Sequence, residues 1–139
     1  MSCILRVYGE QLDVGALTSA VSLEADRIWK KGEKRRAGAG KLQSSSGVTF
    51  VASEADFDCF KVQVRDAIEF LERNLADVSV LSAFPGVERA VLDFGAEMSE
   101  GKVAVSSYLP PQLVRLAASA GIGIEVSVYA CSGDPGGEG

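Results

Sequence analysis

The sequence of 139 residues contains no histidine, one tryptophan and three cysteines. Without histidine, the chain lacks the commonest general base, the usual catalytic triads and most zinc sites. Cys3, Cys59 and Cys131 are odd in number and show no CxxC spacing, which is typical of reduced thiols in a cytosol. No apolar run approaches the roughly 20 residues of a membrane span, and the start of the chain shows no signal-peptide pattern. We therefore expect a cytoplasmic protein with no membrane segment, no metal and no cofactor.

The composition is that of a globular protein, with 47% hydrophobic and 24% charged residues. At this length we expect a single α+β domain over residues 1–131. Residues 132–139 contain nothing apolar to bury, so we expect a disordered tail there. The 14 basic and 19 acidic residues give a net charge of -5, which argues against nucleic acid as the partner.

Hydrophobic periodicity predicts six strands and three helices. Residues 2–9 alternate, with Leu5 and Val7 on one side and Arg6 and Tyr8 on the other, as in a half-buried strand. The pattern as a whole predicts strands at 2–9, 23–29, 48–52, 87–94, 102–108 and 122–130, and helices at 14–21, 57–78 and 110–120. Asp13 can cap the first of these helices, and the apolar face of the long helix, which includes Phe57, Val64, Leu71 and Val78, is expected to lie on the sheet. The order βαββαββαβ predicts a mixed, largely antiparallel sheet with three helices on one face, similar to ferredoxin-like arrangements. Cys3 and Cys59 are then expected to be small buried hydrophobes.

The strongest charge segregation lies in a glycine-rich stretch, residues 30–47, that predicts a long loop. Residues 30–41 hold six of the 14 basic residues and only one of the 19 acidic ones. One interpretation is a site for a small anion or an acidic partner, with Trp29 as an anchor. The other is a solvated loop whose charge aids solubility. The candidate binding residues are Trp29, Lys30, Lys31, Lys34, Arg35, Arg36 and Lys41.

A second candidate surface follows from strand alternation. If the helices cover one face of the sheet, the other face would display Arg6, Tyr8, Asp93, Ser106, Tyr108, Glu125, Ser127 and Tyr129. Three tyrosines among charges resemble an interface, because tyrosine offers contact area together with a hydroxyl. The alternatives are a solvated sheet face and a face shared in a homodimer. The candidate contact residues are Arg6, Tyr8, Tyr108 and Tyr129.

Three features of the sequence carry a resemblance to a known family. They are the first strand leading into a helix after Asp13, the segment Trp29-Lys-Lys-Gly32, and the closing strand Ile124-Glu-Val-Ser-Val-Tyr129. Over about residues 3–131 the chain resembles the bacterial family catalogued as domain of unknown function 4279. The resemblance implies no established activity, and no catalytic residue is carried over from it.

Two functional hypotheses remain from the sequence. The first is a non-catalytic protein-binding module of the immunity or accessory type, binding another protein or a second copy of itself, since small acidic domains often neutralise basic partners. The second is a domain or enzyme that binds a small anionic ligand through residues 30–41. Nucleic-acid binding through the same loop is disfavoured because the rest of the chain is negative.

Overall fold

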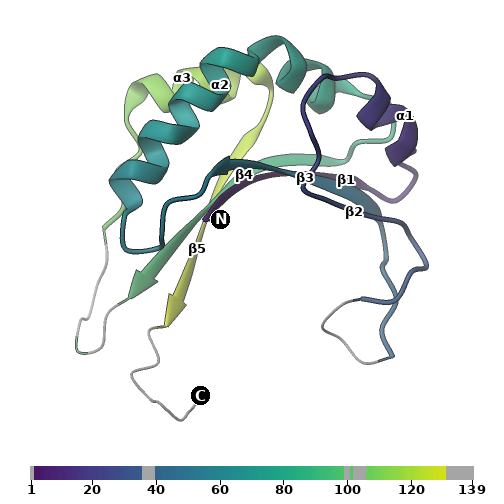
Figure 1. Cartoon of the computed structure of the whole chain (residues 1–139), viewed down its shortest axis with the longest axis horizontal. Coiled ribbons are helices and arrows are strands. Elements are labelled where there is room, and N and C mark those ends of the chain that lie inside the picture. Colours follow the sequence, from purple (N-terminus) through teal and green to yellow (C-terminus); the bar gives the residue numbers. More distant parts are fainter. Residues whose placement is uncertain (1, 36–39, 99–100, 102–105, 131–139) are drawn as a thin grey trace.

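The structure, a computed structural model, describes residues 2–35, 40–98, 101 and 106–130. Three helices lie on one face of a five-stranded sheet (Figure 1). This confirms the predicted α+β class, the mixed sheet and the three helices. The elements are β1 (Cys3–Gly9), α1 (Val14–Ser19), β2 (Arg27–Trp29), β3 (Ser46–Ser53), α2 (Phe60–Ala83), β4 (Arg89–Met98), α3 (Pro111–Ala120) and β5 (Gly123–Ala130).

The strand order is β2-β3-β1-β4-β5, with the N-terminal strand in the centre. β1 is antiparallel to both β3 and β4, β2 is antiparallel to β3, and only β4 and β5 are parallel neighbours. β3 and β4 therefore run parallel to each other on either side of β1, so β3–α2–β4 is a split βαβ unit. This is the feature that the fold shares with ferredoxin-like arrangements.

The expected strand over residues 102–108 is wrong where the structure describes it, because residues 106–108 lie in the loop before α3. Residues 102–105 lie outside the described part of the chain. β4 has β1 on one side and β5 on the other, so no position beside β4 is open for a hairpin partner. Ser106 and Tyr108 consequently do not belong to the sheet face to which the sequence assigned them.

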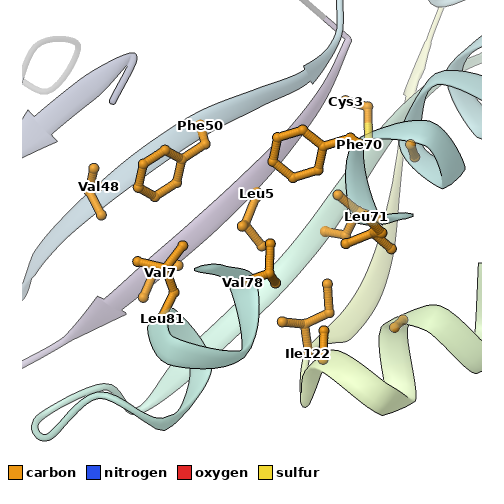
Figure 2. Packing of buried hydrophobic residues seen from close by; sticks show 14 of the residues in the cluster. Cys3, Leu5, Val7, Val48, Phe50, Phe70, Leu71, Val78, Leu81 and Ile122 are labelled. Atoms are coloured by element: carbon orange, nitrogen blue, oxygen red, sulfur yellow. The ribbon is translucent and has the colours of Figure 1, made fainter. Parts of the chain in front are cut away.

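The hydrophobic core fills the space between the sheet and the helices. On β1, the side chains of Cys3, Leu5 and Val7 are fully buried, which confirms the predicted alternation. Leu71 and Val78 of α2 pack against them (Figure 2). The amphipathic pattern of the long helix thus identified its buried face correctly.

The helix ends follow local chemistry. The Asp13 carboxylate accepts a hydrogen bond from the Ala16 amide at the start of α1, and Pro111 occupies the first turn of α3. Gly121 ends α3 in the left-handed conformation, with φ 77°. α2 begins at Phe60 rather than at residue 57, and it is kinked at Asn74, whose backbone leaves helical geometry. The side-chain amide of Asn74 donates a hydrogen bond to the backbone carbonyl of Phe70. It competes there with the backbone hydrogen bonds of the helix.

Candidate functional site

Among the residues that the structure describes, no helix covers the face of the sheet opposite α1, α2 and α3, and this face is concave, because the sheet curves away from the helical layer (Figure 1). Strand register defines which side chains share this concave face, since laterally paired residues point to the same side. The face comprises Ile4, Arg6, Tyr8, Arg27, Trp29, Thr49, Val51, Arg89, Val91, Asp93, Glu97, Glu125, Ser127 and Tyr129. Of the predicted contact residues, Arg6, Tyr8 and Tyr129 lie on it.

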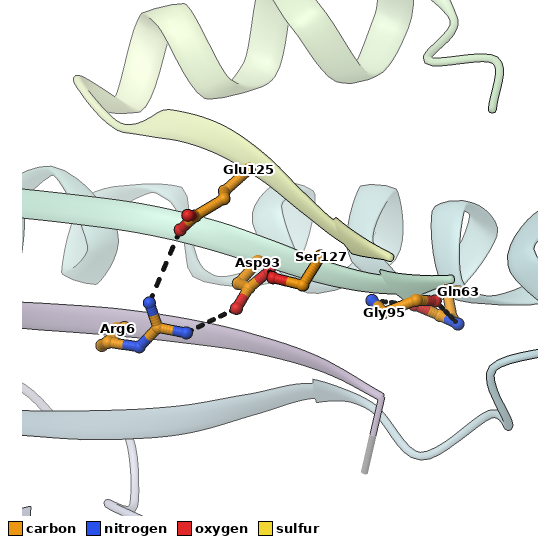
Figure 3. A network of polar contacts seen from close by, with 6 residues as sticks. All are labelled: Arg6, Gln63, Asp93, Gly95, Glu125 and Ser127. Atoms are coloured by element: carbon orange, nitrogen blue, oxygen red, sulfur yellow. Dashed lines mark hydrogen bonds and ion pairs between the residues drawn. The ribbon is translucent and has the colours of Figure 1, made fainter. Parts of the chain in front are cut away.

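A charged network occupies the middle of the concave face. The guanidinium of Arg6 donates to the Asp93 carboxylate at 2.5 Å and lies 3.6 Å from a carboxylate oxygen of Glu125 (Figure 3). The hydroxyl of Ser127 donates to the other Asp93 oxygen at 2.8 Å. Asp93 is largely buried, and these partners compensate its charge. The network links β1, β4 and β5 and fixes Arg6 in place.

Beside this network, Phe57 and Tyr129 form a stacked aromatic pair with ring centroids 5.0 Å apart. Phe57 lies over Gly95, where an added Cβ would come within 2.5 Å of its ring. On the other side of β4, the buried Gln63 accepts from the Gly95 amide and donates to the carbonyls of Gly95 and Asp56. Gln63 therefore holds the segment that carries Phe57 against the sheet. The sequence had assigned Phe57 to the core face of the helix, and this is wrong.

The aromatic pair and the charged network enclose a hollow of about 140 Å³. Its lining consists of Ser2, Ile4, Arg6, Phe57, Asp93, Gly95 and Tyr129. Sites for drug-sized ligands usually measure about 300–1,000 Å³. The size of this hollow suits a single side chain of a partner better than a whole metabolite.

The other end of the concave face, here called its basic end, is aromatic and basic and carries Tyr8, Arg27, Trp29 and Arg89. The indole of Trp29 lies on Gly47, where an added Cβ would come within 2.3 Å of the ring. Tyr8 is the cross-strand neighbour of Gly47 on one side and of Arg89 on the other. Arg27 stands two residues before Trp29 on the same face of β2. Sequence analysis missed Arg27 and Arg89, because only strand pairing shows that they join this surface.

The basic segment continues from this end as an arm, defined here as residues 30–35 and 40–43. The arm lies in the predicted loop, between β2 and β3, and its described parts are joined by backbone hydrogen bonds between Gly32 and Gln43, Gln43 and Glu33, and Arg35 and Lys41. Within the described residues, none of the arm's basic side chains forms an ion pair. Those side chains, all exposed, are Lys30, Lys31, Lys34, Arg35 and Lys41. Arg36 lies outside the described residues.

Tyr108 stands apart from both surfaces. It is 73% exposed and borders a shallow, largely apolar hollow of about 550 Å³ between the start of α2 and the loop before α3. Cys59 and Phe60 line the same hollow. The structure therefore does not bring Tyr108 together with Tyr8 and Tyr129.

The two described thiols have raised pKa values for different reasons. Burial raises the pKa of Cys3, and the nearby charges of Asp93 and Asp66 add to it. Cys59 is exposed, contrary to expectation, and a hydrogen bond to the Asp58 carboxylate raises its pKa. Both thiols are therefore protonated at neutral pH and weakly nucleophilic. Cys131 lies outside the described residues.

The buried thiol predicts a loss of stability at alkaline pH. Folded Cys3 keeps its proton above pH 9.0, the ordinary pKa at which an unfolded chain loses it, so rising pH favours unfolding. Between about pH 8.5 and 10.5 this one group should lower the free energy of unfolding by about 2 kcal/mol. Urea titrations of the wild type and Cys3→Ala at several pH values measure how steeply the free energy of unfolding falls with pH in each protein. Cys59→Ala should change this slope much less than Cys3→Ala does, because the Cys59 thiol is exposed and solvent screens the effect of Asp58 on its pKa. Equal slopes for the wild type and Cys3→Ala would contradict the prediction.

Two features that the described residues lack bear on function. No helix in that part of the chain combines the length and the apolar character that crossing a bilayer requires. Within the same residues, no three Cys, Asp or Glu side chains come together closely enough to hold a metal ion.

Fold and site together define an α+β protein with one helix-covered and one open sheet face, the open face carrying aromatic and charged side chains. The chain belongs to the family described as Domain of unknown function (DUF4279), whose model matches residues 1–131. No curated protein and no solved structure matches the chain.

Proposed function

We propose that the chain is a non-catalytic protein-binding module, of the immunity or accessory type, whose concave face receives a partner protein. The observation that carries the proposal is an uncovered sheet face with Trp29, Tyr8 and Tyr129 set among arginines and carboxylates. Tyrosine, tryptophan and arginine are the residues that dominate binding energy at protein interfaces. A solvated sheet face would need no such set.

The side chains on the face are held in place, which favours binding. Arg6 is fixed by Asp93 and Glu125, and Phe57 by its stack on Tyr129. A partner would therefore lose little side-chain freedom of this protein on docking. The chemistry of the chain favours binding over catalysis, because it has no histidine and its described thiols have raised pKa values.

The test compares baits that differ only on one surface. The wild type and Tyr8→Ala/Tyr129→Ala are used to capture proteins from extract of the organism that encodes the chain. The control bait is Val80→Ala/Val114→Ala, which alters exposed side chains of α2 and α3. We expect a protein that the wild type and the control retain and that the face variant loses by about 10-fold or more, as for loss of interface anchors. If no captured protein depends on the face, the proposal is wrong.

A small-anion site remains the second candidate, favoured by the five exposed cations of the arm. Thermal shift against phosphorylated and carboxylated metabolites tests it. A stabilisation that Lys34→Glu/Arg35→Glu abolishes would support this candidate, and a flat panel would remove it.

A further inference from the structure

The two ends of the concave face differ in the charge that is left unpaired. Asp93 and Glu125 both contact Arg6, so the positive charge of Arg6 is paired within the face, and the three groups together leave one negative charge. Among the residues that the structure describes, Arg27 and Arg89 form no ion pair. The end that carries these two arginines is therefore free to pair with carboxylates from outside.

The same end holds a fixed aromatic anchor. Trp29 lies flat on Gly47, and Tyr8 follows on the neighbouring strand. An indole set against a bare glycine backbone gives a broad apolar contact that needs no rearrangement on binding. Aromatic anchors flanked by arginine are the usual composition of an interface hot spot.

Thr49 adds a side-chain hydroxyl without a hydrogen-bond partner to this end of the face. It pairs laterally with Arg6 on β1 and with Arg27 on β2, so its side chain belongs to the concave face. Its hydroxyl is buried and has no hydrogen-bond partner among the described residues. A buried hydroxyl without a partner is unfavourable, and a small shift of the covering side chains would let an incoming polar group satisfy it.

The arm extends this basic surface beyond the sheet, and the remainder of the chain opposes it in sign. Outside residues 30–41 the chain has eight basic and 18 acidic residues. An acidic partner is thus repelled by most of the molecule and attracted by the arm and the adjoining face. Such a distribution orients an approaching protein before contact.

We infer that the basic end of the concave face docks an acidic segment of a partner protein. The segment lies on Trp29 and Tyr8, and its carboxylates pair with Arg27, Arg89 and the arm. This rests on the proposed function and specifies the chemistry of the partner. It also departs from the expectation that an acidic domain meets a basic partner, because the unpaired charges at this end of the concave face, those of Arg27 and Arg89, are positive.

The test uses an octaglutamate peptide and the full-length chain. Trp29 is the only tryptophan, so its fluorescence reports binding at this end of the face. We expect saturable binding that weakens about 10-fold or more between about 50 and 500 mM salt. Arg27→Glu and Lys34→Glu/Arg35→Glu should each weaken it about 10-fold or more. The matched controls, Lys61→Glu on α2 and Arg115→Glu on α3, should change it less than about twofold.

Several results would overturn the inference. These are absence of octaglutamate binding, tighter binding of octalysine, and equal losses in the variants and the controls. If an oligothymidylate or pyrophosphate binds as tightly as octaglutamate or more tightly, the basic end binds anions in general and is not specific for an acidic protein segment. Failure with octaglutamate while the face-dependent capture succeeds rejects only the acidic segment. Octaglutamate binding without any face-dependent capture rejects the proposed function instead.

Discussion

Replacing Phe94 with alanine is expected to lower the free energy of unfolding by about 3–5 kcal/mol. Phe94 lies on β4, is fully buried, and packs against Phe60 of α2 with ring centroids 5.5 Å apart. The variant loses the burial of the ring and leaves a cavity that close-packed neighbours cannot fill. Urea denaturation of the wild type and the variant measures the difference.

The matched control for Phe94 is an apolar side chain on the surface. Val80 of α2 is 42% exposed, so Val80→Ala should change stability by only about 0.5 kcal/mol. A Phe94→Ala loss no larger than that of the control would mean that the layer between α2 and the sheet is loosely packed. The core described above would then be wrong at this point.

Gln63→Leu is expected to lower the free energy of unfolding by about 1–3 kcal/mol. Leucine has a similar volume but cannot donate to the carbonyls of Gly95 and Asp56, which then lose this partner inside the protein. The Gly95 amide keeps its bond to the Ser2 carbonyl. Urea denaturation measures the loss, and amide hydrogen exchange at residues 56–59 should become faster.

A surface glutamine provides the comparison. Gln112 of α3 donates to the exposed carboxylate of Glu72, so Gln112→Leu should change stability by only about 0.5 kcal/mol. Because Gln63 holds the segment that carries Phe57, its loss should also shift the NMR signals of the Tyr129 ring. Unchanged Tyr129 signals together with lost stability would show that Gln63 supports the core but not the concave face.

The local sequence pattern predicted the structure correctly where one physical cause acts over a few residues. The alternation of β1 identified its buried side, the spacing from Val64 to Val78 identified the inner face of α2, and the Asp13 cap was correct. In each case the side chain's own period or its own hydrogen bond decides the outcome.

The sequence analysis failed where distant segments compete for one place. The residues before α3 alternate like a strand, but β5 takes the position beside β4 through the parallel crossover. Phe57 fits the helical period, yet Gly95 offers its ring a flat surface on the opposite side of the sheet. The backbone hydrogen bonds within the arm could not be predicted either, because no side-chain pattern reveals them. Only strand pairing could show that Arg27 and Arg89 share a surface with Trp29.

The central place of β1 has a consequence for the order in which the chain can fold during synthesis. β1 is synthesised before both of its partners in the sheet, which are supplied by residues 46–53 and 89–98. Until the second of them emerges, β1 has a free backbone edge, and its core-facing side chains Cys3, Leu5 and Val7 are apolar and not yet covered. Completion of the sheet therefore waits for β4 and β5, and β1 depends on protection of its free edge for that interval.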